Sequence, residues 1–268
     1  MSVDRAKRGL AWLPARARSV RPPRWWQEIA SIGIVYYLYS LVRNAVPTGD
    51  AGAFNRARTV LSIEARLHIN VERSLNHFVA SHDWLAYICN YYYSTLHFVV
   101  TIGVLVWLYV KHPLRYRSIR SVLILTNLVA LAGFWLIAVA PPRMLAGYVD
   151  TVVKLHTWGS LASPGLAKKS NQFAAMPSLH IGWSLWCAFA IVALAERRWV
   201  KVLGALYPLA TFFVIIGTAN HFVLDAIGGV VTLGAAILIQ RLLSGRPIYR
   251  TRTIVLPEAE RTRELIRA

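Results

Sequence analysis

Six long apolar segments dominate the pattern of hydrophobic and polar positions along this chain of 268 residues. A helix needs about 20 mostly apolar residues to cross the hydrocarbon core of a membrane. Each segment comes close to that length, and its few charged residues lie near its ends. The segments are residues 25–46, 84–110, 121–142, 171–195, 202–220 and 222–240. The pattern predicts an all-α, polytopic membrane protein with six transmembrane helices.

Residues 53–82 follow a different pattern, because apolar residues recur there at helical spacing with charged residues between them. This pattern predicts an interfacial amphipathic helix between the first two spans. Glu64, His68 and Glu72 recur every four residues and share one face of that helix. We interpret these three residues as a solvated polar stripe.

The composition supports a membrane protein. Residues of the AVILMFWYC set make up 56% of the chain and charged residues 16%, against about 45–50% and 25% in ordinary globular domains. These values exclude a disordered or fibrous chain. Cys89 and Cys187 lie inside apolar runs without a surrounding motif, so they indicate neither a disulfide framework nor a metal-binding knuckle.

The orientation of the chain in the membrane explains most of its net charge of +18. Lys and Arg favour cytoplasmic loops and termini, and 21 of the 30 basic residues fall on one side of a six-span arrangement. We therefore expect both termini in the cytoplasm, with a basic tail at 1–24, a membrane domain at 25–243 and a second tail at 244–268. In a bacterium the membrane would be the plasma membrane. Because orientation accounts for most of the charge, we set a nucleic-acid partner aside.

Three short motifs fall on the same, non-cytoplasmic face of this arrangement. They are PPR at 141–143, MPSLH at 176–180 and NHFVLD at 220–225. Ionisable residues are costly at membrane depth, which makes each motif a candidate for function.

The third motif places His221 and Asp225 four residues apart, so on a helix their side chains touch. A carboxylate that binds one ring nitrogen fixes the tautomer and leaves the other nitrogen as a nucleophile or base. The alternative is a structural pair at the start of a helix.

The other two motifs supply groups that suit a phosphate. Pro177 is typical of the first turn of a helix, and the free N–H groups of Ser178, Leu179 and His180 would then face an anion. His180 could donate a proton to a leaving oxygen, and Arg143 could clamp phosphate oxygens. This set predicts a phosphoryl-transfer site that needs no cofactor and no metal. The alternatives are a plain helix start, a snorkelling arginine, and a zinc site of two histidines and a carboxylate.

At these residues the chain resembles the type 2 phosphatidic acid phosphatase superfamily, whose membrane members have a six-helix core with the site at one membrane face. The resemblance implies that His221 becomes a phosphohistidine and that Asp225 orients it. It implies further that His180 is the acid for the leaving group, and that Arg143 and Ser178 hold the phosphate. We add Leu179 and Asn220 as candidate phosphate-binding positions.

The chain also departs from the family pattern. Leu136, Met144, Leu179 and Ile215 stand where that pattern has Lys, Pro, Gly and Arg. The strings FAAMPSLHIGW and TANHFVLD resemble instead the inositol-phosphotransferase branch, which includes inositol phosphorylceramide synthase and moves a phosphorylated headgroup between lipids. Lys168 and Lys169 are either a replacement for the lost charge or a solvated pair.

These observations predict a metal-independent lipid phosphotransferase or phosphatase, with transfer slightly favoured over hydrolysis. Its partners would be a lipid phosphate, membrane lipids and, for transfer, an alcohol-bearing acceptor. One alternative is a phosphatase of lipid phosphates or isoprenyl (pyro)phosphates. Another is a lipid-binding or scrambling protein without turnover, which the missing cations suggest.

The predicted topology can be tested with single cysteines. A cysteine introduced near Lys168 should react with a membrane-impermeant thiol reagent on intact cells, because we place that loop outside. A cysteine near Arg198 should react only after the cells are opened. The reverse labelling pattern would refute the orientation.

Overall fold

The computed structural model describes residues 24–45, 50–157 and 173–244, which form helices and no strand. The elements are α2 (Trp25–Ala45), α3 (Asp50–Arg66), α4 (Glu72–Ala80), α5 (Asp83–Tyr91), the π-helical η1 (Tyr92–Leu96), α6 (His97–Lys111), α7 (Pro113–Leu136), the 3₁₀-helical η2 (Pro142–Met144), α8 (Thr151–Leu155), α10 (Leu179–Leu194), α11 (Arg198–Gly217) and α12 (Val223–Ser244).

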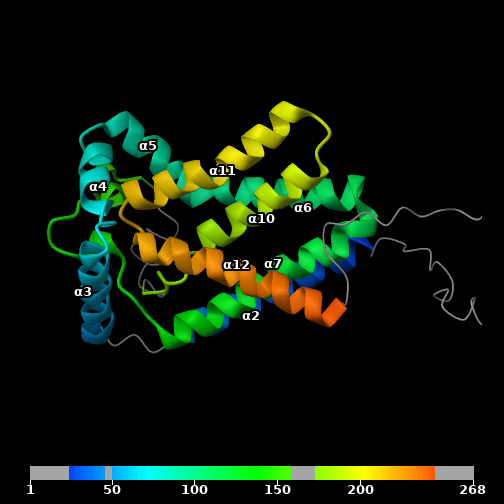
Figure 1. Ribbon diagram of the computed structural model, residues 1–268, viewed down its shortest axis with the longest axis horizontal. Helices are drawn as coiled ribbons and strands as arrows, with labels where there is room; N and C mark the ends of the chain where they lie inside the picture. The colour runs from blue at the N-terminus through cyan, green and yellow to red at the C-terminus, as the bar shows by residue number, and fades with distance from the viewer. Residues whose placement is uncertain (1–23, 46–49, 158–172, 245–268) are drawn as a thin grey trace, which may run out of the picture.

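The long helices form a bundle, and α3 and α4 lie across one of its ends (Figure 1). We call this the α3/α4 end. The turn between α6 and α7, the turn between α10 and α11 and the end of α12 lie at the opposite end (Figure 1). The connections that carry the three sequence motifs, after α7, before α10 and before α12, therefore share the α3/α4 end of the molecule.

Four helices of the described chain are long and apolar enough to cross a membrane. They are the continuous Asp83–Lys111, Pro113–Leu136, Arg198–Gly217 and Val223–Ser244. The all-helical prediction is confirmed, and these four correspond to the second, third, fifth and sixth predicted spans. Helix α2 is not among them; it is tied to α7 by Glu28, whose carboxylate accepts hydrogen bonds from Tyr116 and Arg120.

Two predicted boundaries were wrong. Helix α7 begins at Pro113, not at 121, because proline suits the first helical position and the basic residues that follow fit in the first turns. Helix α10 is apolar but only 16 residues long, since it starts at Leu179 and not at 171. Pro177 thus precedes α10 and does not lie in its first turn.

Residues 173–178 are non-helical backbone packed inside the bundle end. Their polar groups bond to other segments: Val139 N donates to Phe173 O at 2.9 Å, and Ser178 N donates to Asp225 O at 2.9 Å. Non-helical backbone at membrane depth is tolerated only where protein satisfies its polar groups in this way. The segment therefore fixes the start of α10 against α12.

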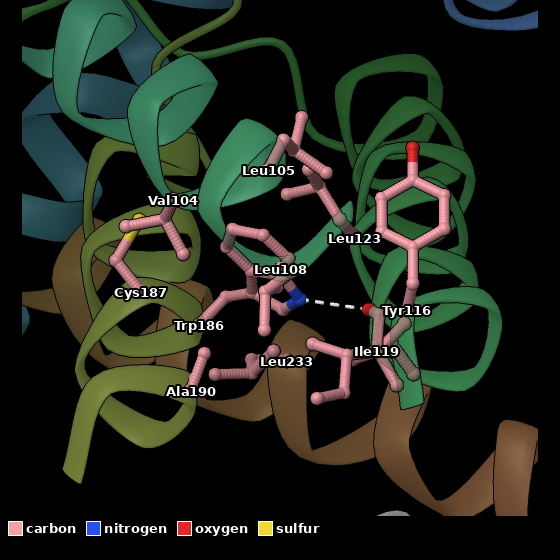
Figure 2. Packing of buried hydrophobic residues seen from close by; sticks show 12 residues of the cluster. Val104, Leu105, Leu108, Tyr116, Ile119, Leu123, Trp186, Cys187, Ala190 and Leu233 are labelled. Atoms are coloured by element: carbon pink, nitrogen blue, oxygen red, sulfur yellow. Dashed lines mark hydrogen bonds between the residues drawn. The ribbon is translucent and has the colours of Figure 1, made fainter. Parts of the chain in front are cut away.

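The main core lies between α6, α7, α10 and α12 (Figure 2). Trp186 is fully buried there, and its indole N–H donates a hydrogen bond to the carbonyl oxygen of Ile119 at 2.8 Å. Burial of an aromatic ring is a large apolar contribution, and a buried indole N–H requires a partner. The tryptophan thus joins α10 to α7.

The predicted helix at 53–82 is two helices, α3 and α4, with a break at His68, whose φ is 56°. The interpretation of Glu64 and Glu72 as solvated was wrong, because both are fully buried. Only His68 of the three is exposed. Helix α3 packs on the bundle end in a cluster that includes Ala57 and Phe222. Its placement at a membrane interface stays a prediction.

Two glycines make the close packing of this end possible. A Cβ on Gly133 of α7 would lie 2.5 Å from Pro177 Cδ, and one on Gly229 of α12 would overlap the carbonyl oxygen of Ser178. Real Cβ atoms do not come that close, so the segment before α10 requires glycine at both positions.

We expect Gly229→Ala to lower stability by about 1–3 kcal/mol, because the added methyl group must displace backbone. Gly234→Ala on the same helix is the control, since a Cβ there meets nothing within 4 Å; it should be neutral or stabilising by up to about 1 kcal/mol. Thermal unfolding in detergent measures both. Equal shifts for the two variants would contradict the packing argument.

Candidate active site

The turn between α11 and α12 holds His221. Ala219 adopts a left-handed conformation with φ 51°, and the N–H groups of Asn220 and His221 both donate to Ile215 O, at 3.0 and 3.2 Å. These bonds follow the end of α11 and place His221 two residues before the first residue of α12. The imidazole is buried, with 5% of the residue exposed.

Asp225 lies in the first turn of α12 and contacts this imidazole. Its Oδ2 lies 3.3 Å from His221 Nδ1 and also accepts a hydrogen bond from Phe222 N at 2.9 Å. The predicted contact is confirmed, although His221 precedes the helix and does not belong to it. His221 Nε2 is buried and has no hydrogen-bond partner within the described part of the chain. The pair therefore leaves one ring nitrogen available for chemistry.

His180, the second residue of α10, faces His221 with 5.5 Å between ring centroids. Its ring contacts two other rings: Tyr93 stacks on it with 4.2 Å between centroids, and the His97 centroid lies 4.6 Å away. His97 stacks in turn on Trp183 at 5.0 Å. Two motifs that are 41 positions apart in the sequence are thus brought together by ring packing.

Sequence reasoning missed Tyr93 and His97. Tyr93 lies in the π-helical segment η1, and His97 begins α6. π-helical turns inside α-helices are frequent at functional sites. The available signal was the string YYYSTLH, which places a histidine inside an otherwise uncharged span.

Ser178 and Leu179 start α10 at the same place. Ser178 is the N-cap residue, and its Oγ is buried without a hydrogen-bond partner among the described residues. Its backbone N–H is not free as predicted, because Asp225 O accepts it. The side chain of Leu179 packs with Ala130 and Phe134 of α7, so only its backbone N–H remains for an anion.

Arg143 lies in η2, and the turn before α12 fixes it. Its backbone N–H donates to Ala219 O at 2.8 Å, and its Nη1 donates to Asn220 Oδ1 at 2.5 Å. Its Nε lies 3.5 Å from Asp150 Oδ2. The Asn220 amide also donates to Thr218 Oγ1, so Asn220 holds the guanidinium; its contact with phosphate stays a prediction.

The positions of the missing family cations lie outside this cluster or inside the core. Leu136 is 80% exposed at the end of α7, and Ile215 is fully buried in a cluster with Ile181 and Ala226. Lys168 and Lys169 lie outside the described residues. His180, His221 and Asp225 do not form a metal-binding group, and no other set of three or more such residues does so in the described chain.

The fold and the site together define a helical membrane protein that carries two facing imidazoles, a carboxylate and a guanidinium at one end of its bundle. The family model of the PAP2 superfamily matches residues 58–239, and the chain belongs to this superfamily. The phosphoinositol dihydroceramide synthase of Bacteroides thetaiotaomicron is 27% identical over 142 residues, which cover 45% of this chain and 44% of the relative. The match thus spans less than half of that relative's length. No solved structure matches the chain.

Proposed function

We propose that this protein is an integral-membrane lipid phosphotransferase that works through a phosphohistidine on His221 and without a metal. The observation that carries the proposal is the His221–Asp225 contact, which leaves Nε2 without a partner opposite His180. Membership of the PAP2 superfamily supports a lipid phosphatase or phosphotransferase. The Bacteroides relative, named as a synthase, supports transfer over hydrolysis.

The first chemical step is attack of His221 Nε2 on the phosphorus of the lipid phosphate ester. The bond to the leaving oxygen breaks, and His180 donates a proton to that oxygen. Asp225 stabilises the positive charge that develops on the His221 ring. In the second step an acceptor hydroxyl attacks the phosphohistidine, gives its proton to His180 and restores His221.

Arg143, the Ser178 hydroxyl and the Leu179 N–H are the groups that would hold the phosphate oxygens. Asn220 and the backbone of Ala219 hold Arg143 before substrate binds, which lowers the cost of ordering it. Ser178 Oγ is buried and lacks a partner among the described residues, as expected for a donor that awaits a ligand.

We place the site on the non-cytoplasmic face, with α2 and α10 as the remaining two of six spans and both termini in the cytoplasm. The basic residues at the end of α6, in the first turns of α7 and around the turn from α10 into α11 lie at the end opposite α3 and α4 (Figure 1). This distribution supports the orientation.

His221→Ala should abolish turnover, because it removes the nucleophile. Asp225→Asn should lower kcat by about 10³–10⁴-fold, and His180→Ala by about 10²–10⁴-fold, less for substrates with good leaving groups. Headgroup release from a lipid substrate in detergent with EDTA measures all three.

His82→Ala, which changes an exposed histidine, is the control. Full activity of His221→Ala would refute the mechanism, and inactivity of the wild type on every lipid class would favour a binding or scrambling protein.

Transfer and hydrolysis differ in what attacks the phosphohistidine. We expect a labelled headgroup of a phosphodiester lipid to appear on an added alcohol-bearing lipid, because the second step needs only a hydroxyl at the site. Inositol- and glycerol-containing acceptors should be tried separately, with thin-layer separation of the lipid products. Label found only in water-soluble product, with every acceptor, would identify a lipid phosphatase.

A further inference from the structure

Two buried carboxyl groups from outside the bundle bind the first turn of α12. Glu64 Oε1 of α3 accepts the N–H of Leu224 at 2.7 Å, and Glu72 Oε1 of α4 accepts the N–H of Val223 at 2.9 Å. Both glutamates are fully buried. The first N–H groups of a helix have no partner within the helix and must find one elsewhere. Asp225 accepts the N–H of Phe222 in the same way. Three carboxyl groups therefore satisfy the three successive amides that follow His221.

The break between α3 and α4 brings the two glutamates together. Eight residues of continuous helix would separate them by about 12 Å along the axis. In the structure α3 ends at Arg66 and α4 starts at Glu72, so both side chains reach adjacent amides of α12.

Neither glutamate has a partner for its second carboxyl oxygen among the described residues. This oxygen, Oε2, is buried in both. A carboxyl and a carboxylate satisfy each other with one proton between them, whereas two carboxylates repel. Burial and the neighbouring Glu72 raise the pKa of Glu64 to about 8, so Glu64 holds this proton at neutral pH.

We propose that Glu64 and Glu72 are positioning residues, a one-proton pair that fixes the first turn of α12 and thereby the His221–Asp225 pair. The role in catalysis rests on the proposed function. The role in holding the helix start does not depend on it.

The other ionisable groups that face the pair set the sign of its pH dependence. The Coulomb interaction with Asp225 of α12 opposes ionisation of Glu64 and so raises its pKa. The pKa of Tyr148, on the segment after η2, is raised by burial to about 12, so Tyr148 stays neutral up to pH 9. Arg73 of α4 acts on Tyr148 and is exposed. Loss of the shared proton would leave three carboxylates around one helix end, whose dipole offsets about half a charge.

The raised pKa of Glu64 fixes the sign of the dependence of folding stability on pH. Glu64 binds its proton more tightly in the folded protein than in the unfolded chain. The stability it contributes is therefore fully present below the ordinary pKa of 4.5 and is lost progressively as pH rises from there to about 8. A glutamine at position 64 keeps the acceptor for Leu224 N and mimics the protonated acid, so it removes this dependence.

The test compares the wild type, Glu64→Gln and Glu64→Ala from pH 4.5 to pH 9, with Glu196→Gln, an exposed glutamate between α10 and α11, as the matched control. Thermal unfolding should agree for wild type and Glu64→Gln at pH 4.5, and Glu64→Gln should melt several degrees higher at pH 9. Amide exchange of residues 222–226 should be faster in wild type than in Glu64→Gln at pH 9. Parallel melting curves for the two proteins across this range would overturn the proton-sharing pair.

Turnover provides the second readout. Glu64→Ala should lower kcat by about 100-fold through misplacement of His221, with a smaller change in KM. Glu64→Gln should restore most of the lost kcat. It should also weaken the fall of kcat above pH 8. A kcat of Glu64→Ala equal to that of wild type would overturn the positioning role. If His221→Ala keeps full turnover, the proposed function fails. The melting and amide-exchange comparison still tests whether Glu64 and Glu72 form a one-proton pair that fixes the start of α12.

Discussion

The start of α12 is the constraint on which the rest of the site depends. This helix begins inside protein, so water cannot satisfy its first N–H groups, and an orphaned buried amide costs about 1–3 kcal/mol. Phe222, Val223 and Leu224 find three different carboxyl groups instead, from Asp225, Glu72 and Glu64. Two of these come from helices that lie across the bundle end. The need for acceptors therefore explains why α3 and α4 fold over the site, and why the turn that carries His221 is fixed from several sides.

A second backbone contact joins the two halves of the site. Ser178 N donates to Asp225 O, so the residue that caps α10 is bonded to the residue that orients His221. Gly229 allows this approach because any side chain there would meet the carbonyl of Ser178. His180 follows Ser178 by two residues, and the ring contacts with Tyr93 and His97 fix its side chain. The distance between the two imidazoles thus depends on backbone packing as well as on the side chains themselves.

Much of this arrangement was predictable from sequence, and the reasons for the failures are physical. Apolar length predicted six spans, four of which are helices long and apolar enough to cross a membrane, and spacing predicted the His221–Asp225 contact. Periodicity could not show that Glu64 and Glu72 are buried, because their partners are backbone amides about 150 residues away in the chain. Nor could it show that α10 starts late, since residues 173–178 are as apolar as a helix but bond their backbone to other segments. Tyr93 was missed because the string YYYSTLH makes only its histidine conspicuous, and the ring on which Tyr93 stacks is distant in the chain.

The distribution of charge bears on the kind of phosphate that the site would hold. Carboxyl groups occupy the N-terminus of α12, so the positive end of that helix is not available to a phosphate. Within the described ranges no carboxyl group binds the start of α10, although the Ser178 amide donates to the backbone oxygen of Asp225. Arg143 is within 3.5 Å of Asp150, which offsets part of its charge, and Leu136 and Ile215 add none. Coulomb attraction scales with the charge of the ligand. A weakly positive site stabilises a dianionic monoester less than a strongly positive site would. The missing cations matter less for a phosphodiester, which carries one negative charge. Headgroup transfer between lipids requires a substrate of this second form.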